Sequence, residues 1–269
     1  MSDVDQEALR AALKEFYFSQ NDIDYTSAKK GLTVVQYWND EPDEQVALII
    51  ENTRREAESY NFRHLLFDEP AARSFLSDRF GLRSVSAFDR SFHQAQKSDI
   101  FRYHYLLSEG GIWVDADITI RGDLTEICKT GTAAISYKNK TTGRLSNRIM
   151  WSSSGTKFMK LVVDEVLCNM EDVSLLRRCA TQRDILSLSG PKIINFVFLK
   201  MINSNDQYAD SENKIFLIDE ENFNQIFISG QSFLGEELSY KDTDRSWQKW
   251  ASEVEGTPIS QYLKKNKRT

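Results

Sequence analysis

One segment constrains this chain more than any other: a helix and a strand are joined by two glycines, and two aspartates follow. Residues 92–109 carry apolar side chains at helical spacing, namely Ile100, Tyr103, Leu106 and Leu107. Gly110 and Gly111 would end this helix, because glycine adopts left-handed conformations at little steric cost. Residues 112–120 are apolar and β-branched as far as Val114, which predicts a strand that reaches Asp115 and Asp117.

The rest of the chain alternates strand-like and helical segments. Apolar, β-branched or aromatic stretches predict strands at 32–38, 61–67, 133–137, 214–218 and 225–229. Helical spacing predicts helices at 5–18, 44–60, 71–80, 156–170 and 192–202. This alternation predicts an α/β fold with a largely parallel sheet. We expect a helical extension over 1–30, one main domain over 31–255 and a basic tail over 256–269, since no repeat or linker divides the chain.

Asp115 and Asp117 are the first candidate ligand residues. Two residues apart on a strand, their side chains would point to the same face. Carboxylates held so close repel each other unless a cation or a proton lies between them, and Mg²⁺ or Mn²⁺ is the natural occupant. The alternative is a solvated strand end, which is the commoner meaning of an isolated Asp-X-Asp.

Asp99 and Arg102 are the second candidate pair. They lie three residues apart on the predicted helix and therefore share a face. They would either bind a ligand together or form a surface ion pair worth a few tenths of a kcal/mol.

Composition excludes some classes of function. A net charge of −6 argues against general nucleic-acid binding. The acidic start lacks the pattern of a signal peptide, and no apolar run approaches the roughly 20 residues of a membrane span. Three widely spaced cysteines suggest neither disulfides nor a zinc site. We therefore expect a cytoplasmic protein, whose basic tail would be solvated or would contact anionic lipid peripherally.

The string from Ala95 to Asp117 resembles the signature of the DXD-containing sugar-transferase family. That family includes yeast-type initiating mannosyltransferases, α-1,4-galactosyltransferases, bacterial capsule and lipopolysaccharide enzymes and, as relatives, clostridial glucosylating toxin domains. The shared pattern is Ser-Asp, two residues, Arg-Tyr, a leucine, Gly-Gly, an aromatic residue and Asp-X-Asp, all present here in order. Weaker resemblances are the strand ending at Tyr37-Trp38, the turn Ser189-Gly190-Pro191 and the pair Ser246-Trp247.

The resemblance implies a type A glycosyltransferase fold, with a Rossmann-like, mostly parallel sheet flanked by helices. Asp117 would bind the metal directly, and Asp115 would contact the ribose or reach the metal through water. Asp99 and Arg102 would bind hydroxyls of the donor sugar. Tyr37 and Trp38 would lie at the nucleotide, with Trp38 either stacked on the base or filling the core.

The C-terminal stretch departs from the family pattern. Many members carry a histidine ligand before Ser-Trp, whereas this chain reads Tyr240-Lys-Asp-Thr-Asp-Arg-Ser-Trp247. Ser246, or else Asp242 or Asp244, would complete an all-oxygen shell for Mn²⁺ or Mg²⁺. Trp247 would cover the leaving phosphate or pack in the C-terminal core.

The implied function is a metal-dependent, retaining glycosyltransferase. Its donor would be a UDP-sugar in preference to a GDP-sugar. Its acceptor would be a saccharide, free or lipid-linked, in surface polysaccharide or lipopolysaccharide synthesis. The alternatives are a toxin-like enzyme that glycosylates protein and a non-catalytic nucleotide-sugar-binding module. Asn147 resembles a family position near the sugar.

Overall fold

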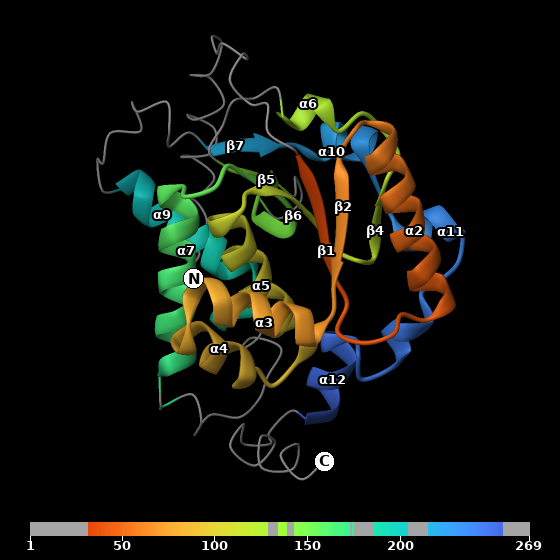
Figure 1. The fold of residues 1–269 in the computed structure, drawn as a ribbon. Helices are drawn as coiled ribbons and strands as arrows, with labels where there is room; N and C mark the ends of the chain where they lie inside the picture. The colour runs from red at the N-terminus through yellow and green to blue at the C-terminus, as the bar shows by residue number, and fades with distance from the viewer. Residues whose placement is uncertain are drawn as a thin grey trace.

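A mixed, mostly parallel sheet forms the centre of the molecule. The computed structural model describes residues 32–128, 134–138, 143–172, 174, 186–203 and 215–254. The main sheet has six strands in the order β2-β1-β3-β6-β5-β7 (Figure 1). They are β1 (Thr33–Tyr37), β2 (Arg63–Phe67), β3 (Gly111–Val114), β5 (Ala134–Lys138), β6 (Leu145–Ser152) and β7 (Ile215–Ile218). Strand β6 is antiparallel to β3 and β5, and the other pairs are parallel.

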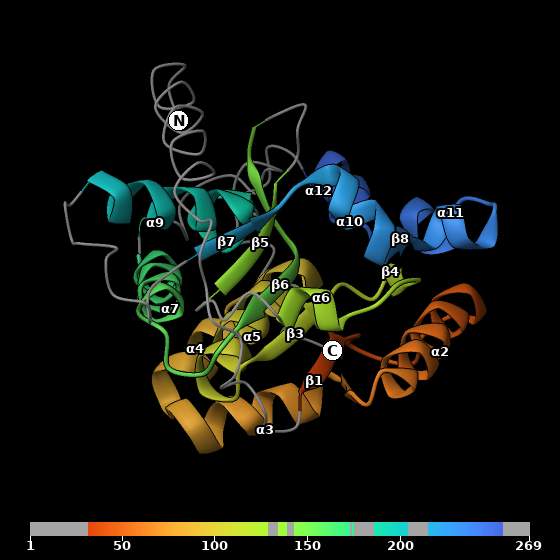
Figure 2. The ribbon, with the colours of Figure 1, turned by 90° about the horizontal axis from the view of Figure 1, so that it is seen from above.

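Helices cover both faces of this sheet (Figures 1 and 2). One face carries α3 (Glu69–Phe80), α4 (Leu82–Asp89), α5 (Gln94–Ser108), α7 (Lys157–Glu171) and α9 (Pro191–Asn203). The other carries α2 (Glu44–Ser59), α6 (Thr125–Cys128), α10 (Glu220–Ile226) and α11 (Gly230–Leu234), with a two-stranded sheet of β4 (Ile118–Ile120) and β8 (Phe227–Ser229). A 3₁₀ turn, η3 (Ser239–Asp242), and α12 (Trp247–Val254) end the described chain. No helix in these ranges combines the length and apolarity that crossing a membrane requires.

Alternation along the strands divides the core into two layers. Val35, Trp113 and Met150 point into the layer beneath α5 and α7. Val34 and Ile112, on the same strands, point into the layer beneath β4 and β8. Successive side chains of a strand face opposite ways, so both faces of the sheet are buried.

The predicted fold class is confirmed, and the expected elements within the described residues appear within a few residues of their predicted bounds. Four parts were not predicted: α4, α6, β6, and the helices that follow β7. The single strand expected over 112–120 is wrong, because the chain turns at 115–117 and separates β3 from β4. The predicted helix over 5–18, the extension over 1–30 and the tail lie outside the described residues, and the domain bounds stay a prediction.

The glycine pair between α5 and β3 is required by close backbone contacts. Gly110 and Gly111 have φ angles of 71° and 106°. A Cβ on Gly110 would lie 2.8 Å from the carbonyl oxygen of Ser152, and one on Gly111 would lie 2.7 Å from that of Thr33. Both positions therefore need glycine for conformation and for space.

Replacing Gly111 with alanine is expected to lower the free energy of unfolding by about 2–5 kcal/mol, because a strained φ adds to a backbone clash. Gly235→Ala is the matched control, since Gly235 also has a positive φ, of 77°, but its Cβ would meet nothing within 4 Å. The control should cost about 1 kcal/mol. Urea unfolding of both variants measures the difference, and equal losses would contradict the proposed clash.

Candidate active site

A cavity of about 420 Å³ lies at the carboxyl ends of β1 and β3. The end of β1 contributes Tyr37 and Trp38, and the turn after β3 contributes Asp115 and Asp117. The buried helix α5 contributes Asp99 and Arg102, and the amino end of β6 contributes Asn147 and Arg148. Two further segments contribute to the wall. One supplies Gly190 and Pro191, and the other supplies Tyr240, Lys241, Ser246 and Trp247. Segments far apart in sequence thus meet at one edge of the sheet.

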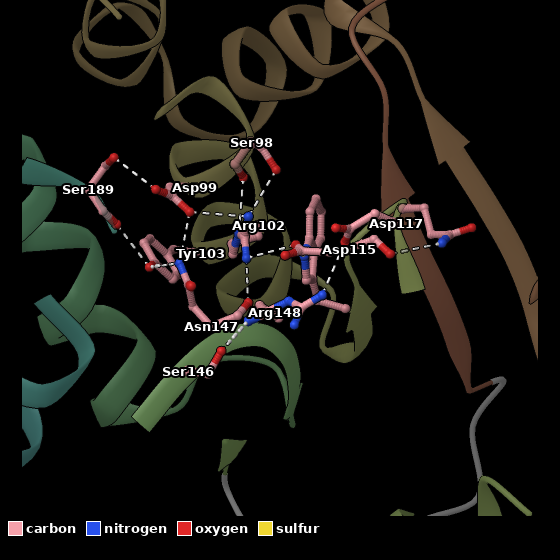
Figure 3. Close-up of polar contacts among 12 residues, drawn as sticks. Ser98, Asp99, Arg102, Tyr103, Asp115, Asp117, Ser146, Asn147, Arg148 and Ser189 are labelled. Atoms are coloured by element: carbon pink, nitrogen blue, oxygen red, sulfur yellow. Dashed lines mark hydrogen bonds and ion pairs between the residues drawn. The ribbon is translucent and has the colours of Figure 1, made fainter. Parts of the chain in front are cut away.

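The Arg102 guanidinium is the centre of the polar network (Figure 3). Its Nη2 lies 3.1 Å from Oδ1 of Asp99, and its Nη1 lies 3.0 Å from Oδ1 of Asp115. It also donates to the carbonyl oxygen of Asn147, and its Cζ lies 4.9 Å from the ring centre of Trp113. The side chains of Asp99 and Arg102 are only 7% and 5% exposed. The alternative of a surface ion pair is therefore wrong.

Asp99 has a donor for each of its oxygens. Nδ2 of Asn147 donates to Oδ1 at 2.8 Å, and the hydroxyl of Ser189 donates to Oδ2 at 3.0 Å. Tyr103 joins the same network, accepting from Asn147 and donating to the Ser189 carbonyl. Burial raises the pKa of Asp99 to about 7, although Arg102, Ser189 and Asn147 act in the opposite direction.

Asp115 and Asp117 lie in a turn and not on one strand as expected. The N–H of Asp115 donates to the Arg148 carbonyl on β6 at 2.9 Å, while the carbonyl of Asp117 accepts from the N–H of Gly230 at 2.7 Å. Both residues line the cavity all the same. The turn brings the two acids together by a different route from the one that the sequence predicted.

The two acids have different partners and different acidities. Trp113 donates to Asp115, whose pKa is raised by burial against the pull of Arg102. Around Asp117, Nη2 of Arg148 lies 3.5 Å from Oδ1, and Nζ of Lys241 lies 3.4 Å from Oδ2. Burial alone would raise the pKa of Asp117, but Arg148, Lys241 and the Tyr240 hydroxyl at 3.1 Å lower it.

The oxygen donors expected for Mn²⁺ or Mg²⁺ do not fit a resident ion in this arrangement. Asp115, Asp117 and Ser246 line the cavity, and hard cations do favour such oxygens. However, cationic side chains are already in contact with both carboxylates. The described residues also form no group of three or more His, Cys, Asp or Glu side chains that could hold a metal. An ion at Asp117 would have to displace Lys241 and Arg148.

The C-terminal segment reaches the cavity through two of its predicted residues. Ser246 and Trp247 line it, whereas Asp242 and Asp244 are exposed and do not. The carbonyl of Asp244 accepts from Nε2 of His93 at 3.0 Å, which fastens this segment to the start of α5. Of the three residues expected to supply the last metal ligand, only Ser246 is therefore at the site.

The end of the cavity near β1 holds polar atoms without partners. Tyr37, Trp38 and Gln94 line the cavity, and the hydroxyl of Tyr37, Nε1 of Trp38 and Oε1 of Gln94 are buried and make no hydrogen bond with any residue that the structure describes. The ring of Trp38 meets Tyr240 edge-on at 5.3 Å. Buried polar groups are normally satisfied, so these atoms suit a polar ligand at this end.

Sequence reasoning missed several polar residues of this cavity, among them Gln94, Arg148, Tyr240 and Lys241. No local pattern distinguishes them, because each acquires its place from long-range packing of β6, η3 and α5 against the turn. The residues before Ser246-Trp247 were the available signal, since they include a tyrosine and a lysine and no histidine.

Arg102→Lys is expected to lower the free energy of unfolding by about 3–5 kcal/mol, because one ammonium cannot pair with Asp99, Asp115 and the Asn147 carbonyl together. The exposed pair Arg73–Asp89, at 2.9 Å, provides the control. Arg73→Lys should cost below about 1 kcal/mol. Chemical denaturation measures the free energy of unfolding of both variants. A similar loss in both would show that the Arg102 guanidinium has no special role.

The stability of the protein should depend on His93 and pH. Nδ1 of His93 caps α5 by accepting from the Ala95 N–H at 3.0 Å, so it must be unprotonated. Burial lowers the pKa of His93 to about 4, whereas the unfolded value is about 6.5. The unfolded chain therefore binds the proton more readily, and this stabilisation is present above pH 6.5 and lost as pH falls toward 4.

His93→Asn keeps a side chain that can cap a helix but cannot titrate. The stability advantage of the wild type over this variant should shrink by roughly 1–3 kcal/mol between pH 7 and pH 4. Urea midpoints across this range measure it, and a constant difference would contradict the assignment.

Comparison with known proteins agrees with this geometry. Residues 32–134 match the family described as "glycosyltransferase sugar-binding region containing DXD motif". A protein of Acanthamoeba polyphaga mimivirus named "uncharacterized glycosyltransferase L373" is 32% identical over 82 residues. The match covers 30% of this chain and 33% of that protein, so the chain spans about a third of the relative's length.

Two solved structures are similar at lower identity. The PaToxG glycosyltransferase is 15% identical with a TM-score of 0.47, covering 96% of this chain and 97% of that one. A glycosyltransferase involved in glycosylation of the major capsid of PBCV-1 is 7% identical with a TM-score of 0.40, covering 83% of this chain and 100% of that one. Residues 32–134, which include Asp115 and Asp117, thus resemble the DXD-containing sugar-binding region of glycosyltransferases.

Proposed function

We propose that this protein transfers a sugar from a nucleoside-diphosphate donor to an acceptor hydroxyl in this cavity. The observation that carries the proposal is the meeting of Asp99, Arg102, Asp115, Asp117 and Asn147 at one sheet edge. Ligands of α/β proteins bind at such carboxyl ends of strands. Carboxylate, amide and guanidinium groups together suit the hydroxyls of a sugar.

The donor would lie along the cavity with its nucleoside near Tyr37 and Trp38 and its sugar near Asp99 and Arg102. The unpartnered polar atoms of Tyr37, Trp38 and Gln94 support a nucleoside at the first end. A UDP-sugar is proposed ahead of a GDP-sugar, with a saccharide acceptor in surface polysaccharide or lipopolysaccharide synthesis, as the family resemblance implies.

The reaction would proceed with retention at the anomeric carbon. The bond from that carbon to the β-phosphate oxygen breaks, and its electron pair stays on the phosphate. The acceptor oxygen bonds to the same face of the carbon, and its proton passes to the leaving phosphate oxygen. The protein's part is to orient both substrates and to stabilise the charge that develops on the diphosphate.

A panel of UDP- and GDP-sugars, with and without saccharide acceptors, tests the proposal by release of nucleoside diphosphate. Asp117→Asn should reduce release at least about 100-fold, since it removes a charge that organises the phosphate end. Asp242→Asn is the matched control, because Asp242 is exposed, lies outside the cavity and should leave release unchanged. Thermal unfolding confirms that both variants fold, and no release from any donor would contradict the proposal.

A further inference from the structure

Two cationic side chains from different elements of the fold contact Asp117 in the cavity. Arg148 comes from β6 and Lys241 from η3, and each side chain is 43% exposed. Their contacts with Asp117, at 3.5 and 3.4 Å, are longer than tight charge-assisted bonds, which are about 2.8 Å. Asp117 therefore keeps both cations at the phosphate end while leaving them free to turn toward an incoming anion.

Cationic side chains outnumber carboxylates in the cavity lining without any added ion. Three carboxylates line it, those of Asp99, Asp115 and Asp117. Four cationic side chains line it as well: Arg102, Arg148, Lys241 and Arg245. Arg245 also pairs with Asp40 at 2.9 Å, outside the cavity wall. A divalent ion at the carboxylates would add positive charge to a site whose acids are already neutralised.

The residue types of the C-terminal stretch agree with a phosphate end that is lined by cationic side chains. The stretch before Ser246-Trp247 contains Tyr240 and Lys241 and no histidine. An ammonium group has three donors and no acceptor, so it cannot coordinate a metal, but it binds phosphate oxygen well. Tyr240 donates to the Asp117 oxygen beside which the Lys241 ammonium lies.

We propose that Lys241 and Arg148 bind the diphosphate of the donor in place of a divalent metal ion. The proposal rests on the proposed function and specifies how its phosphate end works. When the anomeric carbon–oxygen bond breaks, the electron pair left on the β-phosphate is stabilised by the ammonium and the guanidinium fork. Asp117 acts as the positioning residue that holds both cations at the phosphates.

Calorimetric titration of the 269-residue chain with UDP, and separately with GDP, tests the proposal in EDTA and in excess MnCl₂. The wild type should bind at least one of them in EDTA, with an affinity that Mn²⁺ changes by less than about tenfold. Lys241→Met should weaken that binding in EDTA by about 10- to 100-fold, the effect of losing one hydrogen bond to a charged group. Lys241→Arg, which keeps the charge, should restore most of it.

Lys249→Met is the matched control, because Lys249 lies outside the cavity and pairs only at 3.9 Å with Glu253 on α12. It should bind as the wild type does. Binding that requires Mn²⁺ and is unchanged in Lys241→Met would overturn this inference and leave the proposed function intact. No binding of either nucleotide in either condition would overturn both.

Discussion

The buried Arg102 guanidinium is the interaction on which the rest of the site depends. It is fixed to α5, and it reaches Asp99 on its own helix, Asp115 after β3 and a carbonyl of β6. A buried charge is costly unless its donors are satisfied, and here three elements supply the acceptors. Arg102 therefore couples the packing of α5 on the sheet to the alignment of the acids, so a change in either disturbs the other.

Much of this arrangement could be predicted from sequence because it is local. The spacing of apolar residues over 92–109 predicted α5, the glycine pair predicted its end, and Asp99, Arg102, Asp115 and Asp117 were all expected to bind a ligand. Each of these residues lies in the cavity wall. The roles that the resemblance assigns to them, the metal and Ser246 included, stay predictions.

The remainder could not be predicted because it depends on contacts between distant segments. Strand β6 has a polar run at residues 146–148 followed by an apolar run at 149–151, which leaves its direction in the sheet undetermined. Its antiparallel pairing nevertheless brings Asn147 and Arg148 to Asp99 and Asp117. The β-branched residues Ile118, Thr119 and Ile120 continue the strand-like pattern after Asp117, so nothing in the local sequence indicates a turn at Asp115–Asp117. It forms because β4 pairs with β8, more than a hundred residues later.

The turn between β3 and β4 also makes the acid pair a junction between two layers. Asp115 is anchored to β6 in the main sheet, and Asp117 is anchored to Gly230 at the start of α11. A Cβ on Gly230 would lie 2.2 Å from Cδ1 of Ile49 on α2, so α11 packs tightly against α2 at this point. The backbone position of Asp117 is thus linked to how closely α2 and α11 pack together. Evolution or an engineer could tune the chemistry by resizing a side chain in that interlayer contact, without altering any residue of the cavity itself.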